Sequence, residues 1–347
     1  KYLCSQGLKK IHNNCFKALI IKQSNTIHNE VNIRNVQFYI VPLLNALIRI
    51  GDMESKELLF KALIGKTEYF NYVNKDKQSV RENIYTRVAR LCINAKAKQK
   101  RMVDKAADII IDNYPIDTVK TSVMFINATN NIRSELTGLM ANKLANIYKR
   151  PCLILMERNN GMYSGSGRNI TDSFIPDLQL ALNNTNCFEK VSGHKNAFGL
   201  RINKSNISTA ITELDKKYPY SAPITQVDFE IDSTELTQCN VIEIDNFKKY
   251  CGQGIGEPKI AILNVPVDIT QFQLMGKLNN CWKFVSGDDI TFVKFNVDPK
   301  TDMLIDCFSD EWGDNQVNIN LIGTCSINYY KGVAIPQIII EDYEVVT

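Results

Sequence analysis

Histidine is scarce in this sequence, and closely paired cysteines are missing from it. Only three histidines occur among 347 residues, and two of them, His12 and His28, lie in polar surroundings without a carboxylate cluster. We interpret both as surface residues. The ten cysteines stand singly, with no Cys-x-x-Cys pair. This spacing is that of neither a zinc module nor a dense disulfide scaffold, so reduced thiols in a cytoplasmic compartment are expected.

Long apolar runs are missing as well. No stretch approaches the roughly 18 apolar residues of a membrane span, and no signal peptide is visible, so no membrane partner is expected. The composition, with 44% hydrophobic and 22% charged residues, is that of folded globular domains. A net charge of +4 permits local basic patches but does not by itself indicate nucleic-acid binding. Because the chain begins with Lys1 rather than Met, we expect it to be part of a longer protein.

The first third of the sequence has a helical pattern. Apolar residues recur at helical spacing over 2–19 and again over 36–63, where a turn near 49–52 divides the pattern into two helices. A polar junction at 71–78 precedes a long pattern without Pro or Gly at 79–113, which predicts one strongly basic helix. This helix is either a solvated connection or a basic wall beside a nucleic-acid path.

After residue 115 the pattern alternates between strands and helices. Strands are expected at 123–127, 152–156 and 199–202, and helices at 135–148, 175–183 and 206–217. Beyond Pro223 the pattern becomes one of short alternating strands, which is typical of a small closed β-barrel. These strands are expected at 227–231, 260–267, 272–278, 289–295, 317–327 and 335–343.

Two glycine-containing motifs carry the strongest chemical signal. Gly165–Arg168 has the sequence Gly-Ser-Gly-Arg, and we expect it to form a turn. Its hydroxyl and guanidinium suit a phosphate, because Arg offers a planar fork of donors and glycine lets backbone N–H groups approach closely. Ser192–Gly199 places His194 between glycines, where the backbone can turn sharply, so we expect a loop there.

These motifs resemble those of RecJ-type single-stranded-DNA exonucleases of the DHH phosphoesterase superfamily. That family carries a Gly-Ser-(Ala/Gly)-Arg-Ser turn, which Gly165–Arg168 matches before Asn169 departs. It also carries a Gly-Gly-His-x-x-Ala-Ala-Gly loop, from which Ser192 and Phe198 depart. Four further segments resemble the family in collinear order: 42–49, 137–151, 250–258 and 328–342. The resemblance therefore covers nearly the whole chain.

The resemblance implies an α/β plus β architecture with four parts. Residues 1–72 would be the C-terminal helices of the DHH domain, and 73–115 a long connecting helix. Residues 116–218 would be the DHH-associated α/β domain, and 222–347 an OB-fold β-barrel that binds nucleic acid.

The resemblance also implies roles for particular residues. The 5′-phosphate of the substrate would be bound by Arg49, Ser166, Gly167 and Arg168. The catalytic cleft near the scissile phosphate would be lined by Asn45, Gly193 and His194. The plainer alternatives are a surface ion pair for Arg49, a simple turn at Gly165–Arg168, and a histidine bonded to backbone at His194. Phe198 either fills core space or narrows the cleft.

In the barrel, an aromatic ring beside a cation suits stacked bases and phosphates of a single strand. Trp282-Lys283 and Tyr330-Lys331 are such pairs, and we expect them to be exposed and to bind DNA. Because side chains alternate along a strand, about half of the barrel aromatics must instead lie in the core. Lys248, Lys249 and Lys277 would either add backbone contacts or only solvate the surface.

The family binds two Mn²⁺ or Mg²⁺ ions through Asp and His residues in N-terminal motifs, including the Asp-His-His after which it is named. No Asp-His-His occurs here, so no metal ion is expected to be bound by this chain. The two-metal site is expected in an N-terminal DHH domain outside the given residues or in another protein chain.

Two functional classes follow. The first is a RecJ-like 5′–3′ exonuclease that hydrolyses single-stranded DNA, to which this chain supplies the 5′-phosphate site and the DNA-binding part. The alternative is a non-catalytic RecJ-like scaffold or accessory subunit in a replication or virion assembly, which the substituted motif positions favour. A short-oligonucleotide or cyclic-dinucleotide phosphodiesterase is a narrower third interpretation, and the expected OB-fold argues against it.

Overall fold

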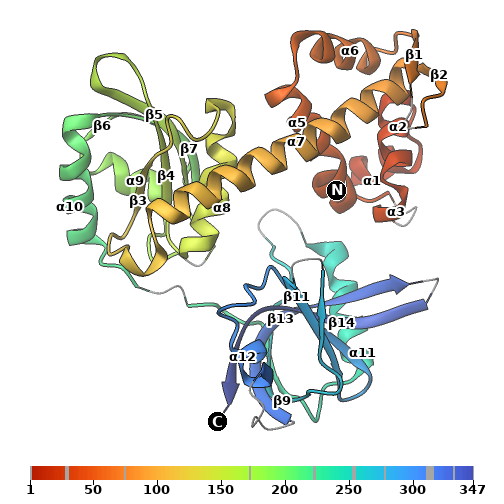
Figure 1. Ribbon diagram of the computed structural model, residues 1–347, viewed down its shortest axis with the longest axis vertical. Helices are drawn as coiled ribbons and strands as arrows, with labels where there is room; N and C mark the ends of the chain where they lie inside the picture. Colours follow the sequence, from red (N-terminus) through yellow and green to blue (C-terminus); the bar gives the residue numbers. More distant parts are fainter. Residues whose placement is uncertain are drawn as a thin grey trace. The chain divides into compact units, whose positions relative to one another are not determined.

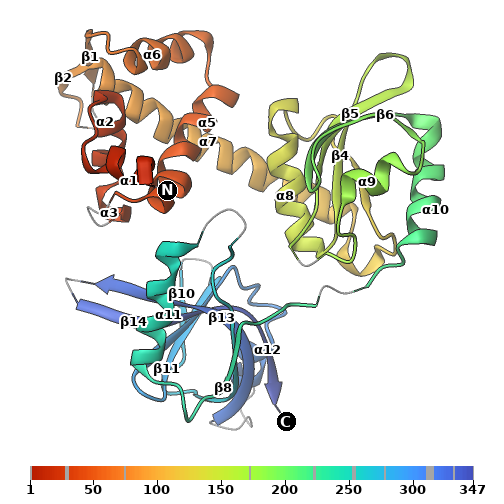
Figure 2. The ribbon, with the colours of Figure 1, turned by 180° about the vertical axis from the view of Figure 1, so that it is seen from behind.

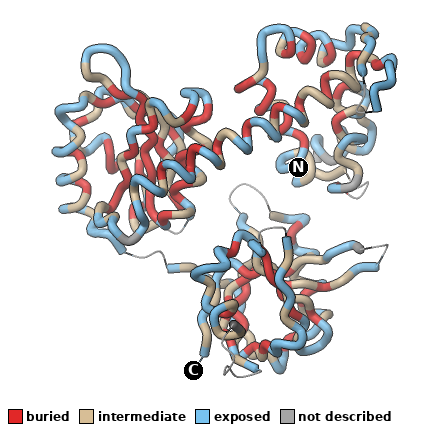
Figure 3. The backbone as a smooth tube through the Cα atoms, viewed as in Figure 1, coloured by how far each residue is buried: buried red, intermediate tan, exposed pale blue. Residues whose placement is uncertain are grey.

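The computed structural model describes residues 2–27, 31–73, 76–171, 173–221, 224–251, 255–276, 279–309, 316–330 and 333–346. They form two compact units, Lys1–Ile224 and Thr225–Thr347, which Figure 1 and Figure 2 show from opposite sides. Buried residues gather inside each unit (Figure 3), so each has a hydrophobic core of its own. None of the described helices is both long enough and apolar enough to cross a membrane.

Short helices form the beginning of the first unit. They are α1 (Tyr2–Lys9), α2 (Asn14–Lys22), α3 (Ser24–Ile27), α4 (Ile33–Asn35), a π-helical turn η1 (Val36–Ile40), α5 (Val41–Ile50) and α6 (Met53–Leu63). The helical pattern over 2–19 corresponds to two helices, because the Asn13 side chain accepts from the N–H of Cys15 at 2.9 Å and starts a new helix. The turn expected near 49–52 is confirmed: α5 ends at Ile50, and Asp52 caps α6.

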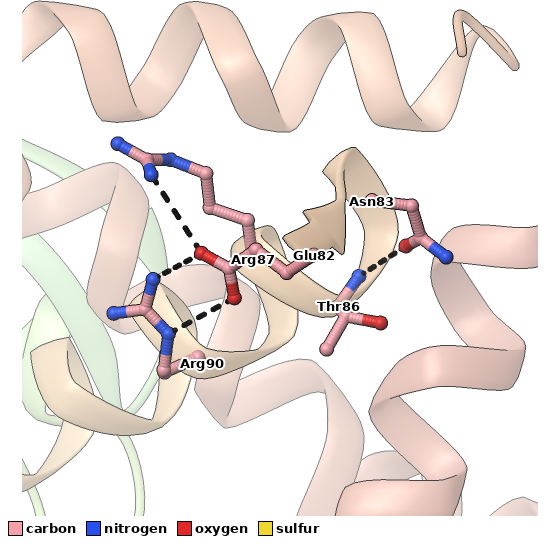
Figure 4. Close-up of polar contacts among 5 residues, drawn as sticks. All are labelled: Glu82, Asn83, Thr86, Arg87 and Arg90. Atoms are coloured by element: carbon pink, nitrogen blue, oxygen red, sulfur yellow. Dashed lines mark hydrogen bonds and ion pairs between the residues drawn. The ribbon is translucent and has the colours of Figure 1, made fainter. Parts of the chain in front are cut away.

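A β-hairpin replaces the expected junction and the first turn of the long helix. Strands β1 (Tyr69–Val73) and β2 (Ser79–Asn83) pair antiparallel, and α7 (Ile84–Asn113) begins five residues later than predicted. The aromatic residues of β1 favour a strand. Asn83 then starts the helix, since its side chain accepts from the N–H of Thr86 at 2.9 Å (Figure 4).

A buried carboxylate attaches this hairpin to α7. Glu82 of β2 is only 7% exposed, and its carboxylate lies between the guanidiniums of Arg87 and Arg90 (Figure 4). The same guanidiniums lie over aromatic rings of β1, Arg87 over Phe70 at 4.5 Å and Arg90 over Tyr72 at 3.9 Å. These two cations therefore hold the hairpin and are not a free basic wall. The exposed cations of α7 lie further along, at Lys98, Lys100, Arg101 and Lys105.

The α/β part of the first unit is a mixed five-stranded sheet in the order β3-β4-β5-β7-β6. Its strands are β3 (Met124–Asn127), β4 (Cys152–Glu157), β5 (Met162–Arg168), β6 (Phe188–His194) and β7 (Ala197–Asn203). Its helices are α8 (Thr137–Tyr148), α9 (Leu178–Asn183) and α10 (Ile207–Lys217), with 3₁₀ turns η2 (Ile116–Thr118), η3 (Ser134–Leu136), η4 (Asn159–Gly161) and η5 (Lys204–Asn206). The strands and helices expected between 123 and 217 all occur, with α9 shorter than predicted.

The two faces of this sheet are covered differently. Leu153 and Leu155 of β4 pack in one core with α9 and α10, whereas Ile154 of the same strand packs in another core with α8. On the α8 side, Ile154 is opposite Ser166 of β5, which is in turn opposite Gly199 of β7. Residues opposite one another share a face. Helix α8 contacts β4 and β5, and on the same side Ser192 and His194 of β6 and Gly199 and Arg201 of β7 are exposed.

Both glycine motifs are strands rather than the expected turn and loop. Gly165–Arg168 is the end of β5, and each of its residues pairs with both β4 and β7. Ser192–Gly199 is the β6–β7 hairpin, with His194 as the last residue of β6. Glycine is a poor strand former, which is why the pattern suggested otherwise. Here Gly167 leaves room for the ring of Phe198, which lies 2.3 Å from where a Cβ would stand.

The second unit is a curved seven-stranded sheet in the order β10-β11-β12-β14-β13-β9-β8. Its strands are β8 (Phe229–Asp232), β9 (Ile260–Asp268), β10 (Gln273–Met275), β11 (Cys281–Ser286), β12 (Ile290–Phe295), β13 (Gln316–Tyr330) and β14 (Val333–Val346). The Oγ of Ser286 donates to the carbonyl of Pro266 at 2.8 Å, which brings β11 against β9, so the sheet curls around its core. Strand β11 and the helices α11 (Gln238–Phe247) and α12 (Met303–Ser309) were not predicted, and a 3₁₀ turn η6 (Lys248–Tyr250) follows α11.

Candidate phosphate-binding site

Three elements of the first unit bring the predicted phosphate ligands together. Arg168 and Ser166 lie two residues apart on β5 and so share a face of the sheet. The Oγ atoms of Ser166 and Thr137, the first residue of α8, are 3.0 Å apart. Arg49, in the last turn of α5, lies close enough to Arg168 for its charge to act on that guanidinium. Arg49, Ser166 and Arg168 therefore lie in the same part of the first unit, and their binding of a phosphate stays a prediction.

Gly138 provides the space in which the Arg168 guanidinium lies. A Cβ at this position would stand 2.8 Å from Nη2 of Arg168 and 3.7 Å from Oγ of Ser166. The guanidinium therefore rests against the first turn of α8. No side chain caps α8 at its Leu136 N-cap, and the N-terminus of a helix carries partial positive charge that favours anions. The sequence analysis assigned no role to Thr137 or Gly138, although their segment matched the family.

The two arginines form a pair of like charges. Burial lowers the pKa of Arg168, and the nearby charge of Arg49 lowers it further. Within the described part of the chain, neither guanidinium forms an ion pair with a carboxylate. Arg168 donates through Nη1 to the carbonyl of Gly167 at 2.7 Å. Two half-buried cations without a carboxylate between them favour the binding of an anion.

His194 lies on the same face of the sheet and is exposed. It pairs with Ala197, which pairs with Arg168, so two strand spacings of about 4.8 Å separate the backbones of His194 and Arg168. Gly193 has φ of +150°, which side chains of L residues rarely allow. Asn45 is exposed one helical turn before Arg49.

Gly167 belongs to the other face of the sheet. Its missing side chain makes room for Phe198, which is 3% exposed and packs in the core with α9 and α10. Phe198 therefore fills core space and does not narrow a cleft. Gly167 contributes to the arginine site only through its carbonyl group.

An open cleft of about 570 Å³ continues from this site along the sheet. Its floor is formed by residues of β5, β6 and β7, and its side by the start of α8. The lining residues are Ser134, Thr137, Met156, Arg158, Ser164, Gly165, Ser166, Lys190, Ser192, Gly199, Leu200 and Arg201. Sequence reasoning missed the cations of this cleft, although period-two alternation along strands, applied to β6 and β7, places Lys190 and Arg201 on the face of Ser166.

The described residues do not fit a two-metal centre. Among them, no group of three or more His, Cys, Asp or Glu side chains is placed to hold a metal ion. His12 is exposed, as expected. His28 lies outside the described residues. All ten cysteines are described, and each is a free thiol.

The expectation that Trp282 binds DNA is wrong. Its side chain is fully buried, and its Nε1 donates to Oδ1 of Asp302 at 3.2 Å. Along β11, Trp282 and Phe284 point inward into the core, so Lys283 lies on the outer face, where it is half-buried. The side chain of Tyr330 and the whole of Lys331 lie outside the described residues.

Phe295 is an exposed aromatic residue that the sequence analysis missed. Lys283 is opposite Val293 of β12, and Phe295 follows two residues later on the same outer face with 51% of its surface exposed. Lys248 is not available for DNA, because it is buried with Asp245 at 3.1 Å and Glu257 at 3.5 Å. Lys277 lies outside the described residues.

Known proteins resemble this chain in both sequence and fold. The sequence model of the RecJ OB domain matches residues 227–342. The whole chain is 34% identical, over 364 aligned positions, to a putative SPbeta prophage-derived single-strand DNA-specific exonuclease, YorK, of Bacillus subtilis strain 168, and equally to its counterpart in Bacillus phage SPbeta. The chain spans 61% of the length of these relatives.

Two crystal structures of RecJ from Thermus thermophilus share the fold. The complex with Mn²⁺ matches 94% of this chain and 44% of that chain with a TM-score of 0.63, and the complex with Mg²⁺ matches 96% and 46% with a TM-score of 0.62. Sequence identity is 13% in both cases. The chain therefore resembles RecJ in fold, and its residues 227–342 match the RecJ OB domain in sequence.

Proposed function

We propose that this chain provides the end-binding and strand-binding parts of a RecJ-like exonuclease that hydrolyses single-stranded DNA from the 5′ end. In this role Arg49, Ser166 and Arg168, with the start of α8, bind the terminal 5′-phosphate. The single observation that carries the proposal is the pair of Arg49 and Arg168, two half-buried cations that act on one another and have no carboxylate partner among the described residues.

His194 lies on the same sheet face as this site and is exposed to solvent. We place it, with Gly193 and Asn45, beside the phosphodiester that is hydrolysed. The hydrolysis itself is proposed to use two Mn²⁺ or Mg²⁺ ions, which activate water and stabilise the leaving oxygen. Their ligands belong to a DHH domain outside this chain or in a partner protein, since the residues described here do not fit a metal centre.

The second unit is proposed to hold the unpaired strand. OB-folds bind oligonucleotides on the face of their second and third strands, where aromatic rings stack on bases. With β9 as the first barrel strand and β10 as a short additional strand beside β11, the second and third barrel strands are β11 and β12, and their outer face carries Lys283 and Phe295. Phe295 replaces Trp282 as the proposed stacking residue. The ten free thiols are compatible with a reducing cytoplasm, where we propose that the protein works.

The test is fluorescence anisotropy of the chain with single-stranded DNA that ends in a 5′-phosphate or a 5′-hydroxyl, at fixed salt. The wild-type chain is expected to prefer the phosphate. Arg168→Ala or Arg49→Ala should weaken binding of the phosphorylated end by about 1–3 kcal/mol, with little effect on the hydroxyl end. No metal ion is needed for this measurement.

Arg101→Ala is the matched control. It removes one exposed cation from α7 and should leave the ratio of the two affinities unchanged, even if both affinities fall. Equal losses for both ends in Arg168→Ala would mean general electrostatic attraction instead of a pocket. Weak binding without preference in the wild-type chain would favour the non-catalytic scaffold.

A further inference from the structure

The face of the sheet that carries Ser166 and Arg168 carries a second group of cations further along the strands. Ser164 of β5 is opposite Arg201 of β7, which is opposite Lys190 of β6. These three positions share one row across the sheet, parallel to the row of Ser166 and the row of Arg168. Arg158, just after β4, joins them, because its Nε donates to Oγ of Ser164 at 2.8 Å.

The charge of this row is only partly balanced. Arg158, Lys190 and Arg201 all line the cleft beside Ser166, and that lining contains no carboxylate. Lys190 is exposed and forms no ion pair with any residue that the structure describes. Glu189 lies 4.0 Å from Arg201, but both side chains are more than half exposed, so their attraction is weak. Glu157 lines an adjoining cleft.

The floor between the two cation groups is flat and open. Gly199 lies between Ser166 and Ser192, and a Cβ built on it would meet no atom closer than 3.8 Å. At about 3.3 Å per strand residue, the row of Arg201 lies about 7 Å from the row of Ser166 and about 13 Å from the row of Arg168. A ligand bound at Arg168 can therefore extend over Gly199 without meeting a side chain.

We propose that Arg158, Lys190 and Arg201 form a second phosphate subsite, which binds another phosphate group of the ligand whose first phosphate lies between Arg49 and Arg168. This inference rests on the proposed 5′-phosphate site. The second phosphate has two sources, the second internucleotide linkage of the strand, which lies beyond the linkage placed beside His194, or the outer phosphate of a 5′-triphosphate. Both present the same anionic oxygens to the same guanidinium and ammonium donors.

The test measures the binding of three single strands of one sequence, labelled at the 3′ end, to the intact chain by anisotropy. One strand has a 5′-monophosphate, one a 5′-triphosphate, and one a 5′-monophosphate with an uncharged methylphosphonate at its second linkage. Lys190→Gln and Arg201→Gln are compared with Lys216→Gln, which removes an exposed lysine from α10 on the opposite side of the sheet.

Each cleft variant is expected to lose about tenfold in affinity for the strand that uses the subsite, the size of one charge-assisted hydrogen bond. If the internucleotide linkage is the source, the natural monophosphate strand loses affinity and the methylphosphonate strand does not. If the triphosphate is the source, the wild-type chain prefers it to the monophosphate, and the cleft variants lose that preference.

Two outcomes would overturn the subsite. In one, Lys190→Gln and Arg201→Gln bind all three strands as the wild type does. In the other, they lose no more than Lys216→Gln. Failure of the proposed function looks different, because the wild-type chain would then not distinguish a 5′-phosphate from a 5′-hydroxyl, whatever the cleft variants do.

Discussion

Three neighbours determine the surroundings of the Arg168 guanidinium, and each has a different effect. The carbonyl of Gly167 accepts from Nη1, the missing side chain of Gly138 leaves room for Nη2, and the charge of Arg49 raises the positive potential. Each neighbour comes from a different part of the chain or from the opposite face of the strand. The position of the guanidinium therefore depends on the packing of α5, α8 and β5 together.

Gly138→Ala tests this dependence. The added methyl would stand 2.8 Å from Nη2, at the far end of a flexible side chain, so the arginine should move and the fold should persist. We expect the preference for a 5′-phosphate to fall about tenfold, with unchanged thermal unfolding. Anisotropy and circular dichroism measure the two effects.

The control for this substitution is Gly7→Ala in α1, where a Cβ would meet no atom within 4 Å. Its preference for the 5′-phosphate should equal that of the wild type. An unchanged preference in Gly138→Ala would show that the position of the guanidinium against α8 does not matter for binding.

Sequence reasoning at this scale identifies residues by the chemistry of their type, and the phosphate-binding roles assigned in this way stay predictions. Arg49, Ser166 and Arg168 were identified by their motifs, and the structure brings them together. Sequence reasoning was wrong where the direction of a side chain determines whether the residue is exposed or buried. Trp282 and Lys283 are neighbours in sequence, yet Trp282 is fully buried and Lys283 is half-exposed. The reason is that only every second residue of the strand faces the core.

The β1–β2 hairpin shows that charged residues predicted to be exposed on a helix can instead form a buried ion-pair cluster with a strand. The sequence predicted one long basic helix, but Glu82, Arg87 and Arg90 form a compact cluster with the rings of β1. Nothing in helical periodicity predicts this cluster, since Glu82 belongs to a strand that pairs with residues about a dozen positions earlier. The glycines of β5 misled prediction similarly, because pairing on both sides overrides their low strand propensity.

Glu82→Gln is expected to loosen the hairpin. The substitution removes the charge that lies between Arg87 and Arg90 and leaves two half-buried cations close together (Figure 4). We expect a loss of about 1–3 kcal/mol in the free energy of unfolding of the first unit, measured by urea denaturation.

Glu135→Gln is the comparison, because its ion pair with Arg133 at 3.2 Å is nearly half exposed. Exposed pairs contribute little, so this variant should unfold almost as the wild type does. If both variants lose the same free energy, the buried position of Glu82 is not what makes it important.

At the scale of the whole molecule, the proposed binding sites lie in different units. All of the residues proposed to bind phosphate belong to Lys1–Ile224, whereas the residues that match the RecJ OB domain lie within Thr225–Thr347. Each unit contains its own core. The predicted finer division into 1–72, 73–115 and 116–218 stays a prediction. In the structure, the helices α2, α5, α6, α7 and α8 contribute to one core.

A chain that ends at Ile224 should therefore keep end selectivity and lose affinity. We expect weaker binding of both phosphorylated and hydroxyl-ended strands, with the ratio between them retained. Anisotropy at two salt concentrations would measure this, and circular dichroism would confirm that the truncated chain is folded. Loss of the ratio in a folded truncation would place end recognition partly in the OB domain.

The like charges of Arg49 and Arg168 bear on how the proposed site would distinguish the end of a strand from its middle. A terminal phosphomonoester carries close to two negative charges above its second pKa of about 6, whereas each internal phosphodiester carries one. A site with two cations and no carboxylate partner among the described residues matches the doubly charged group. The proposed site would therefore bind a doubly charged phosphate more tightly than a singly charged one. It would bind a strand at its phosphorylated end and not along its backbone.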